Sequence, residues 1–95
     1  MPLKRQHVSM RELNEIAGEH GSVYYGSSNN TARRAQQHAR SGYGGTMYYA
    51  NTQNMARAED RLLNSGYQTH NIHGYSGAVE GPGEVYVIQG RKYNR

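Results

Sequence analysis

Apolar side chains recur at helical spacing in three segments of the chain, and the first segment carries a clear start signal. Ser9 stands three residues before Glu12, which is the spacing of a capping box at a helix N-terminus. We therefore predict a helix that begins at Ser9, and we expect Gly18 or Gly21 to end it by taking a positive φ. Its apolar stripe consists of Met10, Leu13, Ile16 and Ala17.

Two later segments have the same periodicity. The second predicted helix is capped by Asn30 or Thr31 and runs through ARRAQQHARS. Its apolar face is made of alanines only, which permits close approach to a sheet but buries little area: Ala32, Ala35 and Ala39. The third predicted helix is capped by Asn51 or Thr52 and stopped by Gly66.

Three short segments rich in Tyr and Val lie between the helices and are typical of strands. They are SVYYG (22–26), TMYYA (46–50) and EVYVI (84–88). The glycine-rich and histidine-rich stretch 66–83 has no clear period and is interpreted as a loop. We therefore predict that residues 1–95 form a single α+β domain, with a small three-stranded antiparallel sheet flanked by helices.

The composition narrows the class of protein. Apolar residues make up 35% of the chain, and Cys, Phe and Trp are absent, so nine tyrosines supply all of the aromatic bulk. Without cysteine the chain has no disulfide, thiolate metal site or cysteine nucleophile, which fits a reducing compartment. No apolar run approaches the ~20 residues that span a bilayer. We expect a soluble, cytoplasmic protein with no membrane partner.

The charge balance points to an anionic partner. Eleven Lys and Arg face seven Asp and Glu, which gives a net charge of +4, and nine of the eleven cations are arginines. Arginine holds phosphate oxygens with a planar fork of donors. We therefore expect a nucleic acid as partner, although plain soluble domains also carry charges of this size.

One residue of the third predicted helix departs from its pattern. Met55, Leu62 and Leu63 define an apolar arc, and Glu59 projects into the middle of that arc. A buried carboxylate without a partner is costly, so Glu59 must meet a cation, a metal or a water-filled cleft. The structural alternative is a helix at a sheet edge with Glu59 paired to an arginine.

The second predicted helix supplies the complementary charge. Arg34 and His38 stand four residues apart, so their side chains lie one turn from each other on the same side of the helix. Such a pair can hold a phosphate between a fork of donors and a titratable imidazole. An Arg-x-x-x-His pair is also common on a solvated basic face.

The stretch VYYGSSNNTARRAQQH resembles the second half of the signature of the GIY-YIG nuclease superfamily. Tyr24, Tyr25 and Gly26 match the Tyr-Ile-Gly triplet that ends a strand, and the following Ser and Asn residues match the turn. Arg34 and His38 match the arginine and histidine of the next helix. By the same resemblance Glu59 corresponds to the metal-binding glutamate, and Asn71 falls where the family commonly has a structural or catalytic Asn.

The first half of the signature is missing from its place. The family opens with a strand that carries Gly-Ile-Tyr, and here that position holds the helix RELNEIAGEH, which has no tyrosine. The C-terminal segment GEVYVIQGRK resembles the missing strand, with Tyr86 at the position of its tyrosine. One interpretation is a circular rearrangement, in which this segment pairs where the first hairpin strand would be. The other is a degenerate domain in which Tyr86 belongs to an ordinary edge strand.

The resemblance implies a metal-dependent endonuclease that hydrolyses phosphodiester bonds in DNA or structured RNA. One Mg²⁺ or Mn²⁺ would be held by Glu59, and Arg34 would neutralise charge that develops on the phosphate. Tyr24 or Tyr86 would act as general base, which requires nearby positive charge because an unperturbed phenol has a pKa of ~10. His38 and Arg34 belong to the same site by this resemblance.

Further residues are candidates for nucleic-acid contacts: Arg33, Arg40, Arg57 and Asn71. DNA is the favoured partner, and a small domain has little surface for reading bases, so specificity would require a homodimer or a partner protein. Two other functions fit the same residues. The chain can be a catalytically inactive nucleic-acid-binding domain that uses these arginines with Arg34 and Arg61, or a protein-interaction module built on its glycine-rich loop and tyrosines. His70 and His73 form a weaker candidate for a zinc site.

Overall fold

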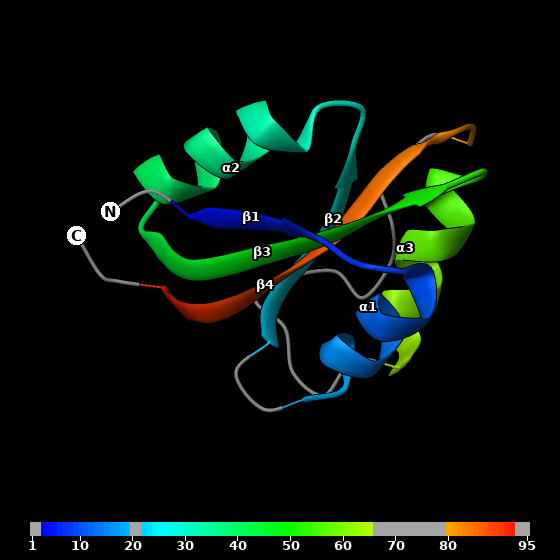
Figure 1. The fold of residues 1–95 in the computed structure, drawn as a ribbon, viewed down its shortest axis with the longest axis horizontal. Helices are drawn as coiled ribbons and strands as arrows, with labels where there is room; N and C mark the ends of the chain where they lie inside the picture. The colour runs from blue at the N-terminus through cyan, green and yellow to red at the C-terminus, as the bar shows by residue number, and fades with distance from the viewer. Residues whose placement is uncertain (1–2, 20–21, 66–79, 93–95) are drawn as a thin grey trace.

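In a computed structural model of the chain, residues 3–19, 22–65 and 80–92 are described, and they form the α+β fold that the sequence predicts. Figure 1 shows a twisted sheet with helices on both faces. In chain order the elements are β1 (Lys4–His7), α1 (Met10–Ala17), β2 (Ser22–Ser28), α2 (Thr31–Arg40), β3 (Tyr43–Thr52), α3 (Met55–Ser65) and β4 (Gly83–Lys92).

The sheet has four strands in the order β1-β3-β4-β2, so the prediction of three antiparallel strands is wrong in its detail. β4 lies between β2 and β3 and pairs antiparallel with both, whereas β1 is added parallel to β3. All four residues of β1 are exposed, so the strand lacks the apolar alternation by which sequence patterns reveal strands. It is anchored by its neighbours Leu3 and Val8, which are both buried.

β3 and β4 are longer than predicted because glycines continue both strands. Gly45 pairs with Gly90, and their φ angles are +111° and +149°. A Cβ atom on either glycine would collide with the backbone of the other strand. Glycine ordinarily weakens a strand, so a prediction from strand propensity ends β3 and β4 too early. Here only glycine permits the close approach of the two backbones.

The helix start at Ser9 is confirmed, because its side chain accepts a hydrogen bond from the backbone N–H of Glu12. The end of α1 differs from the prediction: Gly18 is the C-terminal cap but has a φ of −83°, in the right-handed region. α2 is capped by Asn30, one of the two predicted residues.

The predicted cap of α3 is wrong. Asn51 and Thr52 belong to β3, and Asn54 caps the helix by accepting a hydrogen bond from the backbone N–H of Arg57. Asn54 also belongs to the polar run 51–54 that precedes the helix. The sequence pattern therefore indicates that a residue of this run caps the helix but does not decide which residue is the cap.

The sheet separates two apolar clusters. α1 and α3 cover one face, where Leu13, Tyr25 and Leu62 are fully buried, and the Tyr25 hydroxyl donates to the carbonyl of Ala17 at 2.7 Å. α2 covers the other face (Figure 1). Of its three alanines Ala35 is buried and Ala32 is exposed. In the described ranges no helix is long and apolar enough to cross a membrane.

The cap of α1 makes a direct stability prediction. Ser9→Ala removes the acceptor for the Glu12 N–H, and we expect a loss of about 1 kcal/mol in the free energy of unfolding, measured by urea denaturation. Glu15→Ala, at an exposed position of the same helix, is the control and should change stability by less than ~0.5 kcal/mol. Equal effects of the two substitutions would contradict the capping role.

Candidate active site

Tyr86 is the centre of a cluster of polar and aromatic side chains on the α2 face of the sheet. It lies on the inner strand β4, is 1% exposed, and pairs with Gly26 on β2 and with Tyr49 on β3. Its ring lies over Gly26, because a Cβ atom on that glycine would stand 2.5 Å from the Tyr86 hydroxyl oxygen. The absence of a side chain at Gly26 is therefore what allows the Tyr86 hydroxyl to reach across β2.

His38 comes to this hydroxyl from α2. Its Nε2 atom lies 2.7 Å from the Tyr86 Oη atom, and the imidazole is 9% exposed. Thr31, Ala35 and His38 are the buried residues of α2, and their spacing places all three on the side of the helix that faces the sheet. A phenol and an imidazole can each donate in such a bond, so a proton has a path between them.

Tyr24 and Tyr43 complete the aromatic part of the cluster. The Tyr24 ring centroid lies 4.6 Å from that of His38 and 6.2 Å from that of Tyr86, and the two tyrosine rings are nearly parallel. Tyr43 meets Tyr24 and His38 edge-on at 5.5 and 5.4 Å. Tyr24 is half-buried and Tyr43 is buried, so the cluster opens to solvent on the Tyr24 side and is closed by Tyr43.

Arg34 and Glu59 bring opposite charges to the same hydroxyl. Both lie near enough to Tyr86 to act on its pKa, which Arg34 lowers and Glu59 raises. Glu59 is only 7% exposed, as its position on the apolar arc predicts, whereas Arg34 is exposed. Within the part of the chain that the structure describes, neither side chain forms a hydrogen bond or an ion pair. The alternative of Glu59 paired with an arginine is thus not observed among these residues.

The surroundings of Tyr86 keep its hydroxyl protonated. Burial is the main cause that raises its pKa above the ordinary value, the neighbouring Tyr24 and Glu59 raise it further, and Arg34 only partly opposes them. Burial also raises the pKa of Tyr43. Of the two tyrosines that the resemblance offers as general base, Tyr86 is therefore the less suitable, because a base must lose its proton before it can accept another.

The other candidate residues lie apart from this cluster. Arg33 and Arg40 are exposed on α2, and Arg57 is exposed on the side of α3 that faces away from Leu62. Asn71, His70 and His73 lie outside the described residues. Tyr43 is not among the residues singled out from the sequence, so its contacts with Tyr24 and His38 were missed. The alternation of β3 would have aligned it with Met47 if the strand had been predicted to begin at residue 43.

Glu59 fits a hard divalent cation. The described residues contain no group of three or more His, Asp or Glu that could hold a metal, so a cage made by protein ligands alone is not found there. Mg²⁺ does not require such a cage, because it commonly takes one or two carboxylates together with waters and substrate oxygens. Glu59 is 7% exposed and forms no hydrogen bond or ion pair among the described residues, so its carboxylate is available for such an ion.

Comparisons with protein-family models, with curated proteins and with solved structures found no match to the chain. The geometry of the cluster is therefore the basis on which a function can be assigned.

The contact between Gly26 and Tyr86 can be tested by substitution. Gly26→Ala places a methyl group against the Tyr86 ring, and we expect it to lower the free energy of unfolding by about 1–3 kcal/mol. In a Tyr86→Leu background the same substitution should cost clearly less, because the ring is gone. Urea denaturation of the four proteins measures the coupling, and an equal cost in both backgrounds would show that the two residues do not constrain each other.

The raised pKa of Tyr86 predicts a pH dependence of stability. The neutral phenol is favoured in the folded state, so its contribution is fully present below the unfolded-state pKa of about 10 and is lost as the pH rises above that value. Tyr86→Phe should therefore flatten the decline of the unfolding free energy between about pH 9 and pH 11. Identical slopes for the wild type and Tyr86→Phe would contradict the burial of this hydroxyl.

Proposed function

We propose that the protein is a metal-dependent endonuclease that hydrolyses phosphodiester bonds, with an active site of the GIY-YIG type in which the C-terminal strand takes the place of the first. The pairing of β4 supports this interpretation over an ordinary edge strand. β4 is an inner strand of the sheet, it runs antiparallel to β2, and Tyr86 stands directly opposite Gly26 of the Tyr24-Tyr25-Gly26 triplet. Antiparallel pairing requires adjacency in space only, so the order of the strands along the chain can change without altering the site.

The observation that carries the proposal is the gathering of four side chains from β2, α2 and α3 around the hydroxyl of Tyr86 on β4: Tyr24, Arg34, His38 and Glu59. An ion pair between Arg34 and Glu59 would engage both charges and leave neither for a ligand. Here both charges are without such a partner among the described residues. They are thus available to a ligand that carries a negative charge on one side and a cation on the other.

Each residue has a distinct task in this mechanism. Glu59 would hold the Mg²⁺ or Mn²⁺, which when bound supplies positive charge beside the phosphate and the attacking water. Arg34, exposed at the edge of the cluster, binds the phosphate oxygens and stabilises the negative charge that grows on them during the attack.

Tyr24 is the general base of the proposal. It is half-buried, whereas Tyr86 is 1% exposed, and its ring lies against His38. Tyr86 remains protonated and fixes the imidazole through the 2.7 Å bond. His38 is thereby held against the ring of Tyr24.

The proposal predicts metal-dependent cleavage that depends on Glu59. Plasmid DNA and a short structured RNA, incubated with Mg²⁺ or Mn²⁺, should be cut by the wild type, and Glu59→Gln should abolish cleavage. Tyr24→Phe should slow it by about a hundredfold or more, the usual contribution of a general base. Glu15→Gln, an exposed carboxylate of α1, is the matched control and should leave the rate unchanged.

Binding measurements separate the proposal from its nearest alternative, an inactive nucleic-acid-binding domain. Equal residual cleavage by the wild type and Glu59→Gln would refute the catalytic assignment. Salt-dependent DNA binding by both proteins, in the absence of cleavage, would then identify a binding domain, because phosphate contacts release counterions. Binding that does not respond to salt between about 50 and 200 mM would contradict both nucleic-acid functions.

A further inference from the structure

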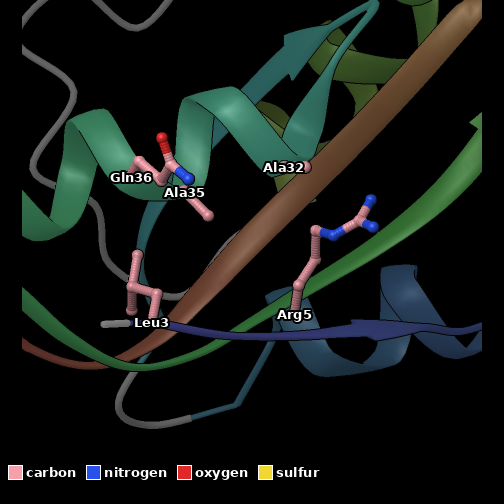
Figure 2. Close-up of a pocket in the computed structure, with 5 residues that line it drawn as sticks. All are labelled: Leu3, Arg5, Ala32, Ala35 and Gln36. Carbon is pink, nitrogen blue, oxygen red and sulfur yellow. The ribbon is translucent and has the colours of Figure 1, made fainter. Parts of the chain in front are cut away.

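A recess lies on the opposite side of α2 from the candidate active site. It has a volume of about 230 Å³ and is formed between β1 and α2, as Figure 2 shows. Leu3 and Arg5 contribute from β1 and the residue before it, whereas α2 contributes Ala32, Ala35 and Gln36. Leu3 and Ala35 are buried and give the recess an apolar floor, and the two long polar side chains stand at its rim.

Arg5 is held in place at this rim before any ligand binds. Its Nη1 atom donates to the Thr31 hydroxyl at 2.9 Å, and its guanidinium carbon lies 4.6 Å from the centre of the Tyr49 ring. The Thr31 hydroxyl in turn donates to the Glu84 carboxylate at 2.9 Å, which completes a chain of three polar groups. A guanidinium has five N–H donors, so further donors remain for a ligand, and their orientation is already fixed.

Gln36 offers the second polar contact. Its side chain is exposed and forms no hydrogen bond within the described part of the chain, so both its N–H donors and its carbonyl oxygen are available. An amide that donates and accepts side by side matches the edge of a nucleobase. The small side chains of Ala32 and Ala35 leave space beside it that larger residues would fill.

The helix itself connects this recess to the candidate active site. At about 100° per residue, Ala32 and Gln36 lie on one side of α2, and Arg34 and His38 lie on the other. Arg33 projects from the ridge between them, away from the sheet, and is exposed. Its guanidinium has no partner among the described residues. A polyanion that is bound to Arg34 and extends across α2 would therefore contact the guanidinium of Arg33.

We propose that this recess binds one unpaired nucleotide of the nucleic-acid substrate, whose strand crosses α2 over Arg33. The inference rests on the proposed function for its substrate class and adds a second subsite to it. The apolar floor takes the base, Gln36 pairs with its edge, and Arg5 binds the adjoining phosphate. A helix with its side chains is ~10–12 Å across, and a stacked strand advances ~3.4 Å per nucleotide, so the bound nucleotide is about three positions from the cleaved bond.

A titration that does not depend on cleavage tests the subsite. The probes are deoxyribonucleoside and ribonucleoside monophosphates, with inorganic phosphate alone as reference, added to ¹⁵N-labelled protein. We expect mononucleotides, but not phosphate alone, to shift the amide signals of Ala32, Ala35 and Gln36. Ala32→Leu, which fills the recess from an exposed position, should weaken this binding by about tenfold or more, because the added side chain occupies the space of the base.

Gln37→Leu is the matched control, because it adds an apolar side chain to the same helix at an exposed position that faces away from the recess. It should leave the titration unchanged, and the amide spectrum of each variant reports its folding directly. The absence of shifts, or equal binding by Ala32→Leu and the wild type, would overturn the proposal. A preference for one sugar would identify DNA or RNA as the source of the nucleotide.

The outcomes separate this inference from the nuclease proposal. Cleavage by the wild type without mononucleotide binding would contradict the subsite and support the active site. Mononucleotide binding that Ala32→Leu abolishes, in a protein that cleaves no nucleic acid, would keep the subsite and remove the catalytic assignment. If both hold, a missing base about three nucleotides from a bond should reduce cutting at that bond in the wild type and not in Ala32→Leu.

Discussion

The passage of the Tyr86 ring across Gly26 is the contact on which the rest of the site depends. The Tyr86 side chain projects from the inner strand β4 across β2, and its hydroxyl oxygen lies 2.7 Å from the Nε2 atom of His38 on α2. Every other member of the cluster is positioned relative to that hydroxyl. The same ring contributes to the apolar cluster under α2, so the side chain that organises the chemistry also packs the sheet.

This double use follows from the composition. A chain without Phe or Trp must fill its interior with tyrosines, and each buried tyrosine brings a hydroxyl that needs a partner. On the α1 and α3 face, the Tyr25 hydroxyl finds a backbone carbonyl and its role ends there. On the α2 face, the hydroxyl of Tyr86 lies 2.7 Å from a titratable imidazole instead, and Glu59 of α3 is near enough to act on its pKa. The α1 and α3 face is therefore an apolar core only, whereas the core on the α2 face also contains side chains that can exchange protons.

The sequence predicts the local features well and the long-range ones poorly. Ser9 and Asn30 act within three residues of their own positions, and Glu59 stands out against its immediate neighbours, so each is visible in a short window. β1 cannot be predicted in this way, because its four residues are all exposed and show no alternation of apolar and polar side chains. It is held to β3 by backbone pairing, which the side-chain pattern does not reveal. The role of Tyr43 is likewise hidden, since its contacts reach to residues on β2 and α2 that no spacing rule connects to it. The motif resemblance relates residues that are further apart in the sequence than periodicity can relate, because it is the sequence feature that assigns Tyr86 and Tyr24 to one site.

The position of β4 also constrains how the cluster forms and how it can be dissected. Tyr24, Arg34 and His38 lie on neighbouring elements of the chain, whereas Tyr86 follows His38 by 48 residues and arrives on the last strand. The pairing of β4 with both β2 and β3 closes the sheet, so the cluster cannot be complete before the whole domain is assembled. Loss of β4 would consequently remove the fold together with the chemistry. Only a substitution that keeps the Tyr86 ring and changes its hydroxyl can separate the contribution of this residue to packing from its contribution to His38.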